Sequence, residues 1–298
     1  MSGRNSHEES TKLATEREAL RHRDKWSVDA PHEELKHVVG RAFAGTADHC
    51  PEEIHRHLLK GLGVPTFDRQ PSRDKAYTFV MSLPLLILEA SNAVMYGHRE
   101  TKGQLSSVLV FDRFDPSEGN NRSLPLLLRQ VAIELHCFVR AYLSSVWSIP
   151  EPFQLYRQSL WTLLDRMHTV GKQLEECHFR FGPATPHYYV YFVAVDPTFQ
   201  GTGRGSELLQ ELHEIADIHA MDCYLECAGG RSRDFYARHG YVVVGTVSLQ
   251  DATDHGDPVG CESVGEHCVE TVYGMVRPHC NKMGPTVHAN DDEQVNEI

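Results

Sequence analysis

Long apolar runs are missing from this sequence. The longest mainly apolar stretch, residues 79–88, covers about ten positions and is interrupted by Ser82 and Pro84, whereas a membrane-spanning helix needs about 20 apolar residues. Residues 1–25 are charged and lack the apolar core of a secretory signal. We therefore expect no membrane partner and a cytoplasmic location.

The chain is also short of basic residues. Its 298 residues include 29 Lys and Arg against 41 Asp and Glu, a formal net charge of −12. General nucleic-acid binders need a basic surface that displaces counterions from phosphates, so we expect no nucleic-acid partner. Hydrophobic residues make up 41% of the chain and aromatic residues 9%, which supplies a buried core and excludes a wholly disordered protein.

Cysteine is too scattered to indicate a disulfide framework. The eight cysteines lie at positions 50, 137, 177, 223, 227, 261, 268 and 280. A chain of this length folds without disulfides, so we expect reduced thiols. His267-Cys268 and His279-Cys280 have the residue types of zinc ligands, but adjacent side chains on a strand point to opposite faces. We therefore expect no metal site.

Both ends of the chain are polar. Residues 1–24 are dense in charge, and residues 281–298 are acidic with few apolar side chains. Such compositions bury too little apolar surface to fold, so we expect a disordered tail at each end. The pattern between them predicts one domain over residues 25–280.

Helical and strand-like patterns alternate within that domain. Apolar residues recur at helical spacing in residues 31–43, 123–146 and 152–177. A further helix is predicted at 51–62, because Cys-Pro-Glu-Glu places a proline and two acids at its positive end. β-Branched and aromatic residues predict a hairpin between 93 and 111 and strands at 187–195, 222–227, 241–247 and 269–276. This order predicts an α/β fold.

A glycine-rich turn follows the expected strand at 187–195. Residues 196–206 read Asp-Pro-Thr-Phe-Gln-Gly-Thr-Gly-Arg-Gly-Ser, and a helix with apolar residues at 208, 209, 212, 215 and 216 comes next. A turn of this kind that opens a helix forms an anion site, because backbone N–H groups converge there and the helix dipole is positive.

Two common phosphate motifs do not fit this turn. The dinucleotide fingerprint fails because Ser206 stands at its third small position, and the triphosphate loop fails because no Lys occurs between 196 and 220. The spacing fits Gln/Arg-x-x-Gly-x-Gly/Ala instead, with Gln200, Gly203 and Gly205.

With this motif the chain resembles the GNAT superfamily of acyl-CoA N-acyltransferases, which binds the coenzyme A pyrophosphate on such a loop. Three more blocks follow in the family's order: Tyr-Val-Tyr-Phe-Val-Ala-Val before the loop, then Cys-Tyr-Leu-Glu-Cys-Ala and Phe-Tyr-Ala-Arg-His-Gly-Tyr after it. The spacing is most similar to a small-molecule branch that includes puromycin N-acetyltransferase. Residues 187–249, the expected cofactor core, carry nearly all of the resemblance.

The resemblance implies a fold and a set of cofactor-binding residues. The fold would be a mixed, mostly antiparallel central sheet flanked by helices, with two long helices before the cofactor-binding strand. Acetyl-CoA would be the co-substrate, its acyl carbonyl and pantetheine arm held by backbone amides where two strands splay apart, at Val193, Ala194 and Val195. The remaining contacts would come from Gln200, Gly201, Thr202, Gly203, Arg204, Gly205, Ser206 and Ser232, the last replacing the branch's usual asparagine.

The same resemblance implies two catalytic residues. Tyr236 would donate a proton to the leaving thiolate, and Glu226, on the strand that borders the gap, would remove a proton from the amine. Each has a structural alternative: Tyr236 as a core aromatic, Glu226 as the partner of a neighbouring arginine. Arg204 could likewise be a solvated surface residue. His187 and His239 flank the motifs and could act in catalysis, but a chain with 19 histidines can place two of them there by chance.

The function implied is acetyl-CoA-dependent N-acetylation of a small primary amine by direct attack. Direct attack needs no covalent enzyme intermediate, so it requires none of the cysteines. Two alternatives stay open: acetylation of a protein or peptide amine, and a catalytically silent CoA-binding regulatory protein.

Overall fold

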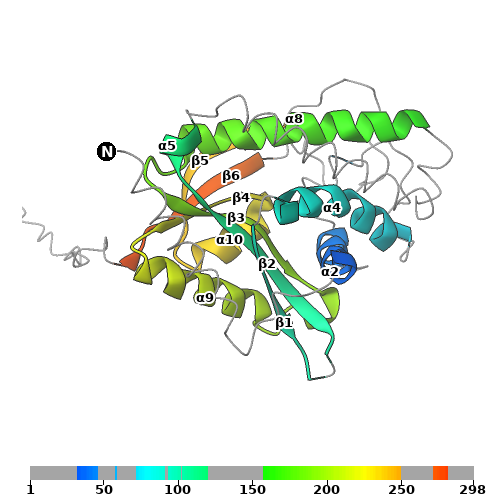
Figure 1. The fold of residues 1–298 in the computed structure, drawn as a ribbon, viewed down its shortest axis with the longest axis horizontal. Helices are drawn as coiled ribbons and strands as arrows, with labels where there is room; N and C mark the ends of the chain where they lie inside the picture. The colour runs from blue at the N-terminus through cyan, green and yellow to red at the C-terminus, as the bar shows by residue number, and fades with distance from the viewer. Residues whose placement is uncertain are drawn as a thin grey trace, which may run out of the picture.

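The computed structural model describes residues 32–45, 58, 72–90, 93–101, 103–119, 157–249 and 271–280. They form a six-stranded sheet with helices on both faces (Figure 1). The expected tails at 1–24 and 281–298 and the expected long helix at 123–146 lie outside these residues. None of the described helices is long and apolar enough to cross a bilayer.

The elements follow the predicted order, except that the helices at 72–90 and 116–119 were not predicted. The helices are α2 (His32–Ala44), α4 (Ser72–Ala90), α5 (Pro116–Gly119), α8 (Arg157–Phe181), η1 (Pro197–Phe199), α9 (Arg204–Ile218) and α10 (Gly229–Ala237). The strands are β1 (Val94–Arg99), β2 (Leu105–Phe114), β3 (His187–Val195), β4 (Asp222–Ala228), β5 (Val242–Ser248) and β6 (Thr271–Arg277). The hairpin of β1 and β2 is confirmed, and α8 continues past the predicted end at Cys177 to Phe181.

The sheet has the order β1-β2-β3-β4-β6-β5. Its neighbours are antiparallel except β3 and β4. These two run parallel because α9 carries the chain back between them, as a parallel pair requires. The predicted mixed, mostly antiparallel sheet flanked by helices is confirmed.

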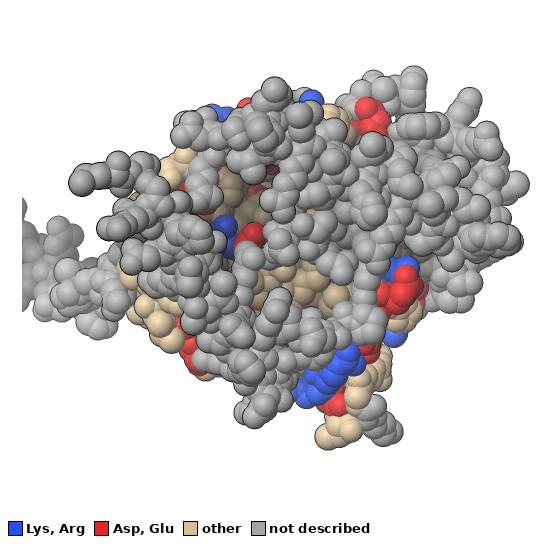
Figure 2. Space-filling view, in the orientation of Figure 1, with Lys and Arg blue, Asp and Glu red and all other residues tan. Residues whose placement is uncertain are grey.

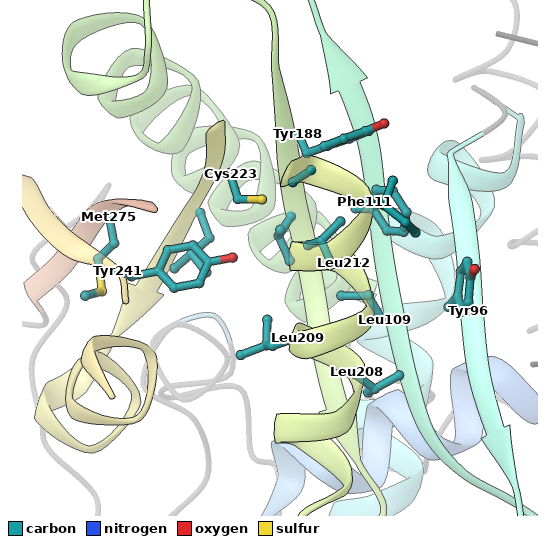
Figure 3. Close-up of a cluster of buried hydrophobic side chains, with 14 of the residues drawn as sticks. Tyr96, Leu109, Phe111, Tyr188, Leu208, Leu209, Leu212, Cys223, Tyr241 and Met275 are labelled. Atoms are coloured by element: carbon teal, nitrogen blue, oxygen red, sulfur yellow. The ribbon is translucent and has the colours of Figure 1, made fainter. Parts of the chain in front are cut away.

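One face of the sheet packs against α9. Because successive strand residues point to opposite faces, Tyr188 and Val190 of β3 share this core with Leu225 of β4. Figure 3 shows Tyr188 of β3 and Cys223 of β4 in this core with Leu212 of α9. The apolar stripe predicted for the helix after the glycine turn is buried here, at Leu208, Leu209, Leu212, Ile215 and Ala216.

The opposite face packs against α2, α4 and α8. Val108 and Val110 of β2 contact the α2 and α4 core, and Val272 of β6 lies in the cluster that α8 covers. In Figure 1, α8 runs along one side of the sheet and α9 along the other. The two faces are therefore covered by segments from before and after β3.

Several charged side chains on the described surface form ion pairs. Arg99 Nη2 lies 2.7 Å from Glu34 Oε2, and Lys36 Nζ lies 2.6 Å from Glu33 Oε1. Figure 2 shows Lys and Arg of the described residues lying beside Asp and Glu on one face of the molecule. Such surface pairs neutralise charge locally but each contributes only about 0–1 kcal/mol to stability.

The crossing of α2 and α4 depends on a glycine. A Cβ on Gly40 would lie 2.5 Å from Thr78 Cα and 2.6 Å from Thr78 N, which are backbone atoms that cannot rotate away. We expect Gly40→Ala to lower the free energy of unfolding by about 1–3 kcal/mol through overpacking. Gly171→Ala in α8 is the matched control: its Cβ meets nothing within 4 Å, so alanine should stabilise the helix by about 0.5–1 kcal/mol. Thermal unfolding of both variants checks the pair; equal melting temperatures would contradict the close crossing.

Candidate active site

The parallel strands β3 and β4 separate halfway along their length. Their pairing ends at Val190 with Leu225, although β3 continues to Val195 and β4 to Ala228. Beyond that point, within the part of the chain described, β3 has no strand partner on its β4 side. Backbone groups that lack a ladder partner must bind something else, and the predicted contacts Val193, Ala194 and Val195 all lie on this stretch.

A β-bulge lies at the same place. Phe111 of β2 pairs with Val190, whereas the adjacent Val110 pairs with Phe192, so Tyr191 is the extra residue of β3. A bulge bends its strand and increases the local twist. The bend in β3 therefore coincides with its separation from β4.

The glycine loop leads from the open end of β3 into α9. Gly201 and Gly203 have φ of 78° and 91°, a left-handed conformation that favours glycine. The first bond of the α9 ladder runs from Glu207 N to Gly203 O at 3.0 Å, and no side chain caps the helix. The N–H groups of residues 204–206 precede that bond, so they have the exposure and dipole that favour an anion.

Side chains of the loop hold its shape. Gln200 Nε2 donates to Val195 O at 3.1 Å, and Thr202 Oγ1 donates to Phe199 O at 2.6 Å. A Cβ on Gly205 would lie 3.3 Å from Phe235 Cζ, so this glycine lets α9 approach α10. These contacts leave the backbone of the loop, rather than its side chains, to face a ligand.

Arg204 is already engaged by acidic side chains. Its Nη1 lies 2.9 Å from Glu207 Oε2, and its Nη2 lies 2.9 Å from Glu100 Oε1. The pKa of Arg204 is raised, first by the hydrogen bond with Glu207. The guanidinium would have to leave one of these partners to meet a phosphate.

An ion pair anchors the start of the loop to α2. Asp196 is buried, its Oδ1 accepts from Thr198 N at 2.9 Å to cap η1, and its Oδ2 accepts from Arg41 Nη1 at 2.9 Å. Arg41 Nε also lies 3.7 Å from Asp74 Oδ2 of α4. Helices α2 and α4, which cover the face of the sheet opposite α9, thus hold the start of the glycine loop that leads into α9.

Glu226 lies at the first β4 position past the last paired residue. Its Oε2 accepts from Tyr189 Oη at 2.6 Å, and its buried Oε1 meets no hydrogen-bond partner among the described residues. Burial raises the pKa of Glu226 to about 7, although hydrogen bonds from Tyr189 and Tyr224 lower it in part. Within the described residues no arginine or lysine pairs with Glu226, so the ion-pair alternative finds no support there.

A pair of histidines lies on the same face as Glu226. His187 Nδ1 is 2.7 Å from Thr185 O, which can only accept, so Nδ1 carries the proton and Nε2 is an acceptor. His178 Nε2 is 2.8 Å from His187 Nε2 and must therefore donate. Burial lowers the pKa of His178 to about 4. Burial also lowers the pKa of His187, so both rings are neutral at pH 7. Neutral, mutually hydrogen-bonded rings suit a structural role rather than proton transfer.

Tyr236 is half-buried on α10, the helix that follows β4. Its ring packs edge-to-face on Phe235, with centroids 5.2 Å apart, and on Tyr241 at 5.7 Å. It belongs to the edge of the α9 core, whereas Glu226 lies on the α8 face. Ser232 lies on the same helix, and His239 Nδ1 donates to Phe235 O at 2.8 Å.

The sequence analysis missed the partners of Glu226. Tyr189 pairs with Tyr224 across the parallel strands, so Glu226 comes two residues later on the same face. The alternation of side chains along each strand places Tyr224 and Glu226 on one face of β4, but only the register of β3 with β4 brings Tyr189 beside Glu226. The bulge at Tyr191 has no glycine or proline signal in β3.

The comparisons with known proteins bear on the same segment. Residues 159–243 match the family model described as an acetyltransferase (GNAT) domain. Over these residues the chain is similar to GNAT acetyltransferases. The match spans α8, β3, the loop, α9, β4 and α10, and so includes Glu226 and Tyr236. The comparison with curated proteins gave no match.

Three solved structures illustrate the low-identity matches to this chain. One from Corynebacterium glutamicum, described as histone acetyltransferase HPA2 and related acetyltransferase, is 19% identical with a TM-score of 0.43, over 88% of this chain and 98% of its own. Arylalkylamine N-acetyltransferase 2 from Aedes aegypti is 13% identical with a TM-score of 0.43, over 85% and 98%. The ribosomal-protein-S18-alanine N-acetyltransferase from Escherichia coli is 10% identical with a TM-score of 0.38, over 85% and 92%.

Proposed function

We propose that this chain transfers the acetyl group of acetyl-CoA to the primary amine of a small molecule by direct attack. The observation that carries the proposal is the Glu226 carboxyl, enclosed where β3 and β4 separate and with a pKa near 7. A base of that pKa is half ionised at neutral pH, which is close to the optimum for removing and releasing a proton. The motif spacing, which resembles a small-molecule branch, favours a small acceptor.

The residues present fit acetyl-CoA. Gly201 and Gly203 have no atom within 4 Å of where a Cβ would stand, so the loop has open space beside its free N–H groups. The pyrophosphate would be held by the loop backbone, and the pantetheine arm and acyl carbonyl by β3 from Val193 to Val195. When bound, acetyl-CoA supplies an activated thioester carbonyl.

Base and acid approach the gap from opposite faces of the sheet. Glu226 would take the proton of the amine from the α8 face, and Tyr236 would donate a hydrogen bond to the departing sulfur from the α9 face. In direct attack the amine adds to the thioester carbonyl as it loses a proton, and the C–S bond of the tetrahedral intermediate then breaks as the thiolate gains a donor, so one group must serve the amine and another the sulfur. This arrangement supports direct attack without a covalent enzyme intermediate.

The proposal is tested by ligand-dependent unfolding followed by an amine panel. A ligand that binds only the native state raises the melting temperature, so saturating acetyl-CoA should raise it, and one or more small primary amines should then release CoA. A shift without CoA release would contradict the proposed acceptor and direct attention to protein amines or a regulatory role. No shift at saturation would contradict the cofactor site.

Tyr236→Phe distinguishes an enzyme from a CoA-binding protein without turnover. We expect turnover to fall by at least about tenfold, because the thiolate loses its donor, while acetyl-CoA affinity stays within about twofold, since a single net hydrogen bond is worth little. Tyr241→Phe is the control, because it removes a buried hydroxyl from the ring that packs on Tyr236. Steady-state kinetics and calorimetric titration measure the two effects. Unchanged turnover in Tyr236→Phe would overturn its role.

A further inference from the structure

We infer that Tyr189 is the positioning residue of the base: its hydroxyl holds one oxygen of Glu226 and leaves the other directed to the amine. The inference rests on the proposed function and deepens it. It assigns a role to a side chain that the sequence motifs do not single out.

The two oxygens of Glu226 have different surroundings. Oε2 accepts a short hydrogen bond, 2.6 Å, from Tyr189 Oη, whereas Oε1 is buried with no hydrogen-bond partner among the residues described. An unpaired buried carboxylate oxygen is costly to maintain. It is retained where a ligand supplies the missing donor, and an amine N–H is such a donor.

The hydroxyl of Tyr224 also lowers the pKa of Glu226, but less than that of Tyr189 does. Tyr224 Oη donates to Cys177 Sγ at 3.6 Å, so its proton is directed to α8. Tyr189 is therefore the donor that fixes the rotation of the Glu226 carboxylate about its side chain. Without it, either oxygen could turn to the amine or away from it.

The ring of Tyr189 is itself held by two neighbouring rings. It stacks on His178, with centroids 4.5 Å apart at 25°, and contacts Tyr191 at 4.4 Å. His178 is fixed by its 2.8 Å hydrogen bond with His187, which Thr185 O holds in turn. The neutral pair of His178 and His187 thus holds the ring of Tyr189 in place, and the Tyr189 hydroxyl in turn holds the carboxylate of Glu226. This role requires no proton transfer by either histidine.

Removal of the Tyr189 hydroxyl should change the pKa of Glu226 in a definite direction. The hydrogen bond from Tyr189 stabilises the ionised form and lowers the pKa of Glu226, so Tyr189→Phe should raise that pKa. Since the ionised form is the base, the acidic limb of the kcat/KM profile should move upward by about one pH unit. Activity lost at neutral pH should return at alkaline pH, which a merely structural defect would not allow.

The chain offers a closely matched control. Tyr188 is the neighbouring residue of β3, is buried on the opposite face, and its hydroxyl lies 2.6 Å from His219 Nδ1. Tyr188→Phe deletes an equally short hydrogen bond from the same strand but away from Glu226. We expect its pH limb to coincide with that of the unmodified protein.

The experiment compares pH profiles of the full chain and its Tyr189→Phe, Tyr188→Phe and Glu226→Gln variants with one amine. A carboxylate infrared band present in the full chain and absent from Glu226→Gln reports the same ionisation without turnover. The inference is supported if the acidic limb of kcat/KM and the pH midpoint of the infrared band both move upward in Tyr189→Phe but not in Tyr188→Phe. An unmoved limb and band, or an equal loss at every pH in both tyrosine variants, overturns it. Absence of turnover in the full chain would overturn the proposed function, while the infrared titration still decides whether Tyr189 sets this ionisation.

Discussion

Glu226→Gln should lower kcat/KM by about 10²–10⁴-fold, the range for loss of a general base. Glutamine keeps the size of the side chain and an oxygen that can accept from Tyr189, but it cannot take a proton. Acetyl-CoA affinity should stay nearly unchanged, because the loop that would hold the pyrophosphate is on α9 and Glu226 lies on the α8 face. Steady-state kinetics and calorimetric titration of the purified variant measure both quantities.

The pH dependence follows from the same carboxyl. With a pKa near 7, Glu226 is protonated and inactive as a base in acid, so activity should fall as the pH drops through about 7. Glu226→Gln should lack this limb. A variant that retains activity and the limb would show that another group is the base.

Stability provides the control for Glu226→Gln. The native pKa of about 7 lies above the ordinary 4.5, so the native state binds the proton more tightly than the unfolded chain. Native stability therefore decreases as the pH rises from about 4.5 to about 7, by about 3 kcal/mol. Glutamine has no such penalty, so the melting temperature of the variant at pH 8 should be no lower than that of the unmodified protein. Lost activity would then not reflect unfolding.

Gly203→Val should weaken acetyl-CoA binding by at least about tenfold. Gly203 has φ of 91° at the start of α9, and a side chain in the left-handed region costs about 1–2 kcal/mol, with β-branched residues disfavoured further. The loop must either keep that strain or change the direction of its N–H groups. A loss of about 1.4 kcal/mol in binding is already tenfold, and calorimetric titration measures it.

Gly240→Val separates strain from binding. Gly240 has φ of 86° in the turn before β5, and its Cβ would meet Arg277 Cγ at an ordinary 3.8 Å. This variant should be destabilised to a similar extent but bind acetyl-CoA normally. Equal loss of affinity in both variants would mean that general destabilisation, rather than the shape of the loop, weakens binding.

Local patterns were sufficient to predict the strands, α9 and the glycine loop, but not α4, which contains Pro84. Helical spacing gave the buried stripe of α9, from Leu208 to Ala216, and β-branched residues gave β3 with the observed bounds. Glycines at 201 and 203 predicted the turn, and both have positive φ. These features depend on neighbours in the sequence, and local chemistry decides them.

Features that depend on distant residues were not predictable in this way. Arg41 and Asp196 are 155 positions apart, and only the packing of α2 brings them together. The bulge at Tyr191 arises from register with β2, because the local sequence favours an uninterrupted strand. Tyr189 meets Glu226 through the register of β3 with β4. A single sequence contains the side chains for these contacts but not the pairing that aligns them.

Helices from different parts of the chain cover the two faces of the sheet, which affects how substitutions could change the site. Elements before β3 cover the face where Glu226 would take the proton, and elements after the glycine loop cover the face of Tyr236. Mutations in α2, α4 and α8 can therefore reshape the surroundings of the acceptor while the donor side is conserved. Arg41 of α2 is the exception, because a change there would also release Asp196 at the start of the glycine loop.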